Sequence, residues 1–241
     1  MASHNGEQYI KAQIESILAQ LSPDDELIIS DDGSTDRTIE IIRTYNDSRI
    51  KYIHFQHCNN FSNRRLSSYY YATANFFNAL EHALGDFIFL SDQDDIWMPT
   101  KVKDCLQILK QNDIVCHNFS IINKDGEIEV DKYDNKVKYD KLNMIQYLRI
   151  LPFRGCCLAF RRNVLKLARP YPRHVFLHDC YIGLVAVVNH QRFAYLDKPL
   201  ILYRRHEQNV SSLDAGNPFW FKCWYRLKLL IQACMHQKYK N

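Results

Sequence analysis

The sequence contains no apolar stretch of 18 residues and no secretory h-region. Because a helix needs about 20 mostly apolar residues to cross a bilayer, these absences argue against a membrane-spanning or secreted chain. The eight cysteines form no C-x-x-C pair, and several stand inside apolar runs, as Cys116 does after Ile114 and Val115. Buried thiols in a reducing cytosol explain this distribution better than a disulfide framework or a zinc site. We therefore predict a cytoplasmic protein.

The net charge of the chain is also small. Lys and Arg number 31 and Asp and Glu 27, so the net charge is +4, which gives no argument for a nucleic-acid partner. The excess lies in the C-terminal tail, where residues 217–241 hold five basic residues and no acidic one. With 241 residues, 46% of them hydrophobic, the chain can bury a full core, and it shows no internal repeats.

Hydrophobic periodicity predicts alternating helices and strands. Helical spacing marks residues 10–21, 36–45, 72–84, 100–111 and 179–188, and short apolar runs mark strands at 27–30, 50–55, 87–91, 114–119, 156–160 and 199–203. A turn signal at 124–127 predicts a hairpin between 121–122 and 128–130. This alternation indicates an α/β fold, with a doubly wound mixed sheet and helices on both faces.

Three carboxylates, Asp92, Asp94 and Asp95, follow the apolar run 87–91. Ligands of open α/β sheets bind at such C-terminal ends of strands. Carboxylates this close repel one another unless a cation lies among them, and a divalent metal that also holds a phosphate is the natural cation. A strand-end turn with Asx caps is the alternative interpretation.

A second acidic segment, residues 31–36, ends the strand predicted at 27–30. Its carboxylates should therefore lie on the same sheet edge as Asp92. Two acidic strand ends at one sheet edge can have separate roles in binding a nucleotide. One can hydrogen-bond the base or ribose, while the other holds the diphosphate through a metal.

Several segments, taken in order, resemble the family 2 glycosyltransferases, which have the GT-A fold. Within that family the chain is most similar to the rhamnosyltransferase-like branch that builds bacterial surface polysaccharides. The resemblance covers about residues 4–212 and rests on residues 5–7 (NGE), 30–36 (SDDGSTD), 92–97 (DQDDIW), 155–162 (GCCLAFRR), 178–179 (HD) and 203–211 (YRRHEQNVS).

The resemblance implies how a nucleoside diphosphate sugar, linked to UDP or dTDP, would bind. Asp32 would accept a hydrogen bond from the pyrimidine ring, with Asp31 nearby, and Asn5 would contact the nucleotide. The alternative for Asp31 and Asp32 is an N-cap pair for the following helix.

The same resemblance implies a bound Mg²⁺ or Mn²⁺. Asp94 would bind the metal directly, Asp92 would contact the metal through water or the ribose, and Asp95 would orient its neighbours. His206 would contact the metal or a phosphate, with a surface histidine as the alternative.

Arg204 and Arg205 fall in a segment that resembles the family's mobile loop over the diphosphate. Guanidinium groups match phosphate oxygens in geometry, so both are predicted donor contacts. A solvated charge pair is the alternative.

Asp179 falls where the family keeps the carboxylate that removes the proton from the acceptor hydroxyl, which implies an inverting displacement. A helix N-cap is the alternative for this residue. His178 either packs in the protein or hydrogen-bonds the acceptor. Gly155 either lets the acceptor approach the backbone or packs closely against neighbouring residues. Trp97 is expected to pack under the metal loop, and stacking on the acceptor is its alternative role.

Two segments depart from the family pattern. Only residues 1–4 precede Asn5, so the first strand is expected to be truncated, and we expect the chain to be less stable than a version extended by several apolar residues. Residues 59–71 form an unusually long segment, interpreted as a donor-specificity loop, a lid or an insertion.

A composition change after Ser212 divides the chain into a glycosyltransferase domain of residues 1–215 and an aromatic and basic helical tail of residues 216–241. Trp220, Trp224, Leu227 and Ile231 share one helix face, with Leu229 on the polar side. Residues 219–235 either contact a membrane or dock on the domain. In the first case the protein would be a peripheral protein at the inner face of the plasma membrane.

The sequence thus predicts a metal-dependent inverting glycosyltransferase that moves a sugar, with rhamnose as a candidate, to a hydroxyl of a glycan or lipid-linked acceptor. A catalytically silent nucleotide-sugar or glycan-binding module is the alternative. An Asp-dependent phosphotransferase is disfavoured because the partner Lys and the nearby Thr or Ser that it needs are not recognisable.

Overall fold

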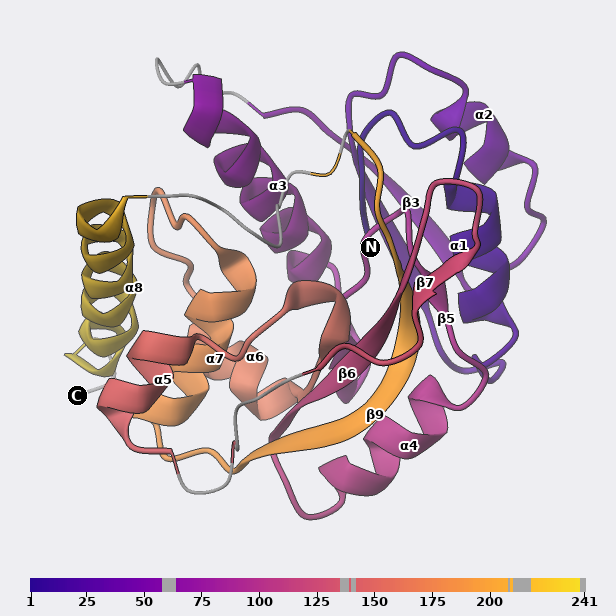
Figure 1. Ribbon diagram of the computed structural model, residues 1–241. Helices are drawn as coiled ribbons and strands as arrows, with labels where there is room; N and C mark the ends of the chain where they lie inside the picture. The colour runs from indigo at the N-terminus through magenta and orange to yellow at the C-terminus, as the bar shows by residue number, and fades with distance from the viewer. Residues whose placement is uncertain (58–63, 135–138, 140–141, 208, 210–217, 239–241) are drawn as a thin grey trace.

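The computed structural model describes residues 1–57, 64–134, 139, 142–207, 209 and 218–238 (Figure 1). In chain order the elements are β1 (Ala2–Ser3), α1 (Ile10–Leu18), β2 (Leu27–Asp32), α2 (Thr38–Arg43), β3 (Ile50–Phe55), α3 (Arg64–Glu81), β4 (Phe87–Phe89), β5 (Ile96–Trp97), α4 (Lys101–Leu109), β6 (Ile114–Ile122), β7 (Ile128–Val130), α5 (Met144–Ile150), the 3-10 helix η1 (Gly155–Cys157), β8 (Leu158–Arg161), α6 (Arg162–Ala168), α7 (His178–Val188), β9 (Phe193–Arg204) and α8 (Phe219–Lys238).

The strands form two adjoining sheets. β1, β2 and β3 make a parallel three-stranded sheet, and a six-stranded sheet has the order β4-β8-β6-β9-β5 with β7 paired to β6. In the larger sheet β6 runs parallel to β9 but antiparallel to β7 and β8. The backbone amide of Ala2 donates to the carbonyl of Ser91 at 3.3 Å, so the short first strand connects β2 to the loop after β4.

Helices cover both faces of the sheets (Figure 1). α1, α2 and α4 lie on one side, and α3, α6 and α7 lie on the other, with α8 outermost against α7. All six residues of β2 and all nine of β6 are buried, as expected for strands covered on both faces. The predicted mixed α/β architecture with helices on both faces is confirmed, and so is the hairpin of β6 and β7.

Some element boundaries differ from the prediction because tertiary contacts decide them. α3 begins at residue 64 rather than 72, so most of the predicted loop 59–71 is helical, and residues 58–63 lie outside the described part of the chain. Tyr69 and Tyr70 pack on the ring of Phe176, at centroid distances of 4.8 and 5.7 Å, which gives the first turns of α3 a half-buried face. β9 also begins earlier than predicted, at residue 193, because it pairs along β6.

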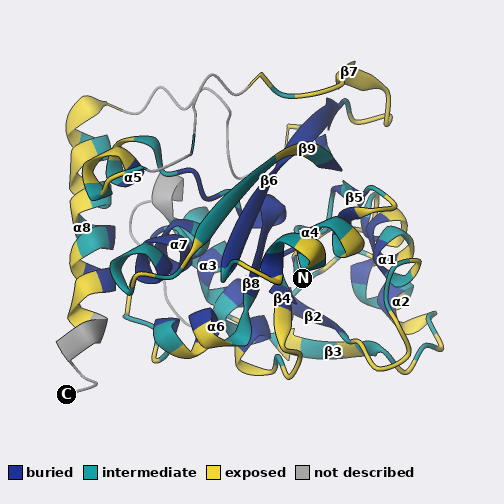
Figure 2. Cartoon of the chain, turned by 90° about the horizontal axis from the view of Figure 1, so that it is seen from below, coloured by how far each residue is buried: buried dark blue, intermediate teal, exposed yellow. Residues whose placement is uncertain are grey.

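α8 docks on the domain through one face (Figure 2). Leu229 and Ala233 are fully buried against α7, and the Tyr225 ring lies 5.6 Å from that of Phe176. The assignment of Leu229 to the polar side is therefore wrong, because the face opposite the tryptophans is the one that packs. Docking is thus shown for the described part of the tail.

Candidate active site

Gln93 ties two polar loops together at one edge of the sheets. Its side-chain oxygen accepts a hydrogen bond from the His4 backbone amide at 2.8 Å, and its side-chain nitrogen donates to the His4 carbonyl at 2.9 Å. A Cβ on Gly6 would lie 2.4 Å from the Gln93 oxygen, so any other residue at position 6 would displace the Gln93 side chain from these hydrogen bonds. The loop that carries Asp92 and Asp94 therefore sits directly beside the loop after β1.

Asp31 is fully buried and hydrogen-bonded within the protein. Its carboxylate accepts from the Ser3 hydroxyl at 2.7 Å, from the Ser34 hydroxyl at 2.6 Å and from the Ser34 backbone amide at 2.8 Å. Asn5 accepts a hydrogen bond from the Thr35 amide at 2.9 Å. Both side chains shape the loop after β2 in this conformation, and their contacts with a donor remain predictions.

Asp32 contacts a residue that sequence reasoning missed. Its carboxylate accepts from the His57 backbone amide at 3.0 Å and lies 2.8 Å from His57 Nδ1, while the His57 ring stacks on Tyr71 at a centroid distance of 3.6 Å. β3 is in register with β2, so that Phe55 pairs with Asp32. The strand-end argument that found Asp32 applies equally to the residues just after β3, and it would have found His57.

The capping alternative for Asp31 and Asp32 is wrong. The N-cap residue of α2 is Arg37, and the carboxylate that accepts from a backbone amide in the first turn is that of Asp36, from Thr38 at 3.0 Å. The two aspartates end β2 too far upstream of α2 to cap it.

Asp94 and His206 come together, although 112 residues separate them. Asp94 Oδ2 lies 2.8 Å from His206 Nε2, and the Asn209 side-chain amide donates to the same oxygen at 3.3 Å. The His206 ring also lies 4.9 Å from the Tyr9 ring. The two predicted metal-site residues thus share one location, and the alternative of a surface histidine is disfavoured.

Arg204 is buried, so the alternative of a solvated charge pair is wrong for this residue. Its Nε donates to the Asp94 carbonyl at 3.0 Å, and its guanidinium lies 4.7 Å from the centre of the Tyr9 ring. Arg205 is half-buried, with its guanidinium 5.9 Å from the Tyr203 ring centre. Arg204 thereby supports the acidic loop, and phosphate contacts by either arginine remain predictions.

Negative charge is concentrated between Asp92 and Asp95. Burial, with the nearby charges of Asp94 and Asp179, raises the pKa of Asp92 to about 7. Burial and the charges of Asp94 and Asp92 raise the pKa of Asp95 well above its usual value. A cation bound nearby would stabilise the ionised form of these crowded carboxyl groups. Oxygen ligands together with one imidazole suit Mg²⁺ or Mn²⁺.

Asp179 lies in the first turn of α7 and is held by two backbone amides. Its Oδ2 accepts from Gly155 at 2.8 Å and its Oδ1 accepts from Cys180 at 2.7 Å. The N-cap residue of α7 is Leu177, so the capping alternative for Asp179 is wrong. Gly155 is followed in the chain by Cys156, whose sulfur lies within 4.8 Å of an Asp92 carboxylate oxygen, so Asp179 lies near the acidic loop.

The three residues predicted to meet an acceptor are tightly packed. A Cβ on Gly155 would lie 3.1 Å from His178 Nε2 and 3.6 Å from Asp179 Oδ2. His178 is buried and stacks on Phe76 at 3.9 Å, and burial lowers its pKa. Trp97 is buried too. Close packing, one of the two alternatives for each of them, is therefore supported, and contact with an acceptor remains a prediction.

Lys101 is a further residue that the sequence did not reveal. It is fully buried at the start of α4, its Nζ donates to the Cys156 carbonyl at 2.7 Å, and it lies 4.2 Å from the centre of the Trp97 ring. Lys101 therefore fixes the turn that holds Asp179 through Gly155. A lysine in an amphipathic helix normally indicates a solvent face, so the sequence contained no signal for this role.

The chain is similar in sequence to known glycosyltransferases. The model of Glycosyl transferase family 2 matches residues 1–167. The chain is 28% identical over 253 aligned positions to dTDP-rhamnosyl transferase RfbG of Shigella flexneri, which covers 99% of this chain and 81% of the relative. It is also 31% identical over 144 positions to UDP-Glc:alpha-D-GlcNAc-diphosphoundecaprenol beta-1,3-glucosyltransferase WfgD of Escherichia coli. That alignment covers 59% of this chain and 53% of the relative.

A solved structure shows the same fold. S. aureus TarS 1–349 in complex with UDP-GlcNAc superposes with a TM-score of 0.67 at 18% sequence identity, over 95% of this chain and 64% of that one. The chain thus spans about half the length of WfgD and less than two thirds of the TarS fragment.

Proposed function

Because the chain belongs to glycosyl transferase family 2, we propose that it moves a sugar from a nucleoside diphosphate donor to a hydroxyl group of a glycan acceptor, with inversion at the sugar carbon. The pairing of Asp94 with His206, beside Asp92 and within the electrostatic reach of Asp179, carries this proposal. These residues are the proposed metal ligands and a separately held carboxylate, and their position near one another at one edge of the sheets supports the proposal.

Asp94, His206 and Asp92 would hold Mg²⁺ or Mn²⁺. The metal would stabilise negative charge on the departing diphosphate. Arg204 is already fixed by the Asp94 carbonyl and Tyr9, so it keeps the ligand loop in place. Arg205, which is half-buried beside Tyr203, is the proposed phosphate contact. The predicted contacts of Asp92 with the ribose belong to the same arrangement.

Asp32 would accept a hydrogen bond from the pyrimidine ring of the donor. The His57 imidazole lies 2.8 Å from this carboxylate and would have to share it or move aside. Asn5 and Asp31 keep the surrounding loop in shape. RfbG is named as a dTDP-rhamnosyl transferase, so dTDP-rhamnose is the first donor candidate and a UDP-linked sugar the second.

Asp179 would act as the general base. As the acceptor oxygen attacks the sugar carbon, its proton passes to a carboxylate oxygen of Asp179 while the bond to the diphosphate breaks on the opposite face. The amides of Gly155 and Cys180 hold that carboxylate in one orientation. His178 and Trp97 support this region and remain proposed acceptor contacts.

A donor screen tests the proposed function. Purified protein is heated with UDP-, dTDP- and GDP-linked sugars, with and without Mn²⁺, because a ligand that binds only the native state raises the melting temperature. We expect dTDP-rhamnose with Mn²⁺ to give the largest rise, and the same donor to be consumed when an acceptor glycan is added. Stabilisation without transfer or donor hydrolysis would instead identify a catalytically silent binding module.

The exposed face of α8 supports a lipid-linked acceptor at a membrane surface. Trp220, Trp224, Leu227 and Ile231 are 80%, 48%, 58% and 49% exposed, on a helix segment that has basic but no acidic residues. Aromatic and basic side chains favour an anionic lipid interface. No helix within the described ranges is both long and apolar enough to cross a membrane. We therefore propose residues 1–215 as the catalytic domain and 216–241 as a membrane-contact tail at the inner face of the plasma membrane, of which α8 is the described part.

Vesicle binding tests the tail. The double variant Trp220→Ser, Trp224→Ser should bind anionic vesicles at least about tenfold more weakly, because each buried apolar side chain contributes about 1.5–3 kcal/mol. Ile145→Ser removes an exposed apolar residue from α5 and serves as the matched control. Co-sedimentation that is equal for both variants, or that is no weaker with zwitterionic lipid, would contradict membrane contact by α8.

A further inference from the structure

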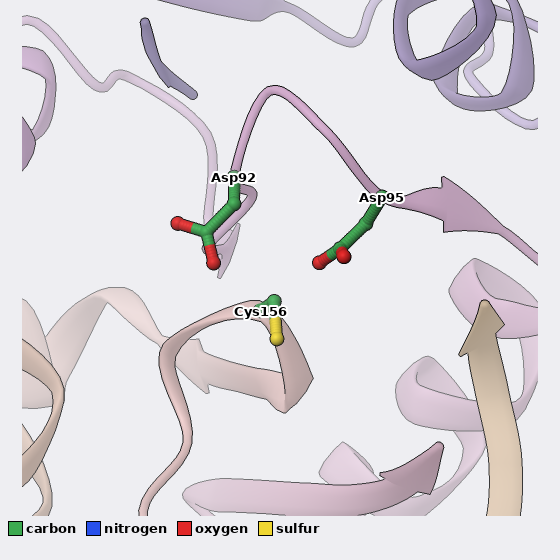
Figure 3. A group of neighbouring side chains, drawn as sticks. All are labelled: Asp92, Asp95 and Cys156. Carbon is green, nitrogen blue, oxygen red and sulfur yellow. The ribbon is translucent and has the colours of Figure 1, made fainter. Parts of the chain in front are cut away.

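Three potential metal ligands from distant parts of the chain face one space below the loop between β4 and β5. Figure 3 shows Asp92 and Asp95 at the two ends of this loop, with Cys156 below and between them. One oxygen of each carboxylate and the Cys156 sulfur all lie within 4.8 Å of one another. The two aspartates and the cysteine are separated by about 60 residues of sequence, so only the fold brings them together.

Asp95 provides an independent sign that something binds here. The residue is 1% exposed, its Oδ1 accepts from the Arg204 backbone amide at 3.1 Å, and its Oδ2 has no hydrogen-bond partner among the described residues. Figure 3 shows the carboxylate directed toward the space between Asp92 and Cys156. A buried carboxylate oxygen without a partner is costly, and a cation bound at this place would remove that cost.

The Cys156 backbone is firmly held, whereas Asp92 can adjust. The Lys101 Nζ donates to the Cys156 carbonyl at 2.7 Å, and both residues are buried. The Asp92 carboxylate makes no hydrogen bond to any part of the chain that the structure describes, and it is half-buried. A tetrahedral zinc ion, bound at about 2.3 Å to sulfur and about 2.1 Å to oxygen, holds its ligand atoms about 3.5 Å apart. Binding therefore draws the three ligand atoms together by up to about 1.3 Å from their present spacing of at most 4.8 Å, and the Asp92 carboxylate is the ligand with room to move.

We propose that Asp92, Asp95 and Cys156 form a divalent-cation site that prefers zinc or cadmium to magnesium. The preference follows from the sulfur ligand, since thiolates select soft and borderline metals and Mg²⁺ takes oxygen ligands. On binding, the Cys156 thiol loses its proton to solvent and the thiolate bonds to the metal, so one proton is released for each bound ion. Two carboxylates and one thiolate leave the fourth tetrahedral position to water.

This site differs from the proposed catalytic metal site but shares Asp92 with it. Asp94 points to His206 and belongs to the catalytic arrangement, whereas Asp95 and Cys156 belong to the thiolate site. Because one carboxylate serves both, zinc or cadmium in the thiolate site should compete with Mn²⁺ for Asp92. The inference does not rest on the proposed function, because it concerns metal binding by the protein alone.

Cadmium titration tests the thiolate site. A cadmium-sulfur bond gives an ultraviolet charge-transfer band, so the protein is titrated with Cd²⁺ after the exposed Cys223 and Cys234 have been replaced by serine. We expect Cys156→Ser to lose the part of the band that arises from the Cys156 sulfur and to bind Cd²⁺ at least about tenfold more weakly. Asp95→Asn keeps the sulfur, and we expect it to retain the band but to bind Cd²⁺ more weakly. Isothermal titration with Mg²⁺ should show a much smaller loss in Cys156→Ser.

Cys105→Ser is the matched control, because Cys105 is also fully buried but lies in the separate cluster under α4. Circular dichroism and thermal unfolding establish that each variant folds. An unchanged cadmium band in Cys156→Ser, or an equal loss in Cys105→Ser, would overturn the proposal. Should Cys156→Ser fail to fold, Asp95→Asn decides the matter, since undiminished Cd²⁺ affinity in that variant also overturns it. Donor binding and transfer are not read in this experiment, so its failure leaves the proposed function untouched.

Discussion

Replacement of Asp94 by alanine is expected to lower sugar transfer by about 10²–10³-fold or more, because charge on the departing diphosphate then loses its main stabilisation. Asp94 Oδ2 lies 2.8 Å from His206 Nε2, so the change removes a central carboxylate of the predicted metal site. The Mn²⁺-dependent part of the melting-temperature rise with donor should disappear in the same variant. Initial rates of donor consumption and thermal shifts with and without Mn²⁺ provide the two measurements.

A surface aspartate provides the control for this prediction. Asp24 is exposed in the turn before β2, and Asp24→Ala should retain wild-type transfer and metal response. Asp94 also accepts a hydrogen bond from Asn209, so the unfolding temperature of Asp94→Ala without ligands must be recorded to separate lost chemistry from lost stability. Normal transfer by a folded Asp94→Ala protein would show that this carboxylate is not part of the reaction.

The second large effect is expected at Asp179. Asp179→Asn should lower kcat by about 10²–10⁴-fold while the affinity for donor and metal stays within about twofold of wild type, because an amide cannot take up the acceptor proton. Single-turnover transfer, together with donor titration followed by thermal shift, separates the two quantities. The split between them distinguishes a base from a donor-binding residue.

The packing of Asp179 requires a second variant. Both carboxylate oxygens accept backbone hydrogen bonds, from Gly155 and Cys180, and asparagine can accept only one of them. A modest fall in melting temperature is therefore expected in Asp179→Asn without any role in catalysis. Asp197→Asn changes a carboxylate that is likewise hydrogen-bonded, to Asn118 and Lys132, but lies in β9 at a surface position, and it should transfer sugar normally. A fast Asp179→Asn enzyme would exclude the general-base assignment.

The acidic strand ends were predictable because the signals are local. An apolar run followed at once by Asp92, Asp94 and Asp95 marks the end of a covered strand wherever the rest of the chain goes. The same holds for Asp31 and Asp32 at the end of β2. Strand and helix types also follow from periodicity over a few residues, and boundaries such as the start of α3 do not, because Phe176 supplies the surface that Tyr69 and Tyr70 cover.

The partners of those acids were not predictable in the same way. Sequence resemblance placed His206 and Asp94 in one site, but it said nothing of His57 beside Asp32, Gln93 beside His4 or Lys101 under Cys156. Each of these pairs joins residues that are 25 or more positions apart. Of the three, only the position of His57 could have been anticipated, since it follows a strand adjacent to β2.

The cysteine prediction shows the same limit. The absence of a C-x-x-C pair argued against a metal-binding cysteine, and five of the cysteines in the described ranges are indeed buried. Cys223 and Cys234 are exposed on α8, so burial does not hold for them. Cys156 lies near Asp92 and Asp95 without any spacing motif, because these two carboxylates come from a different loop.

The amino-acid sequence by itself determined the types and order of most strands and helices, although not β5, α5 or α6, together with the positions of the acids at the strand ends and the membership in a glycosyltransferase family. These depend on chemistry within a few neighbouring residues. The tertiary structure alone decided which carboxylate oxygen lacks a partner, which arginine is buried, which face of α8 stays exposed and which cysteine joins the acids. Such properties depend on what the rest of the folded chain places around a side chain, and no short stretch of sequence contains that information.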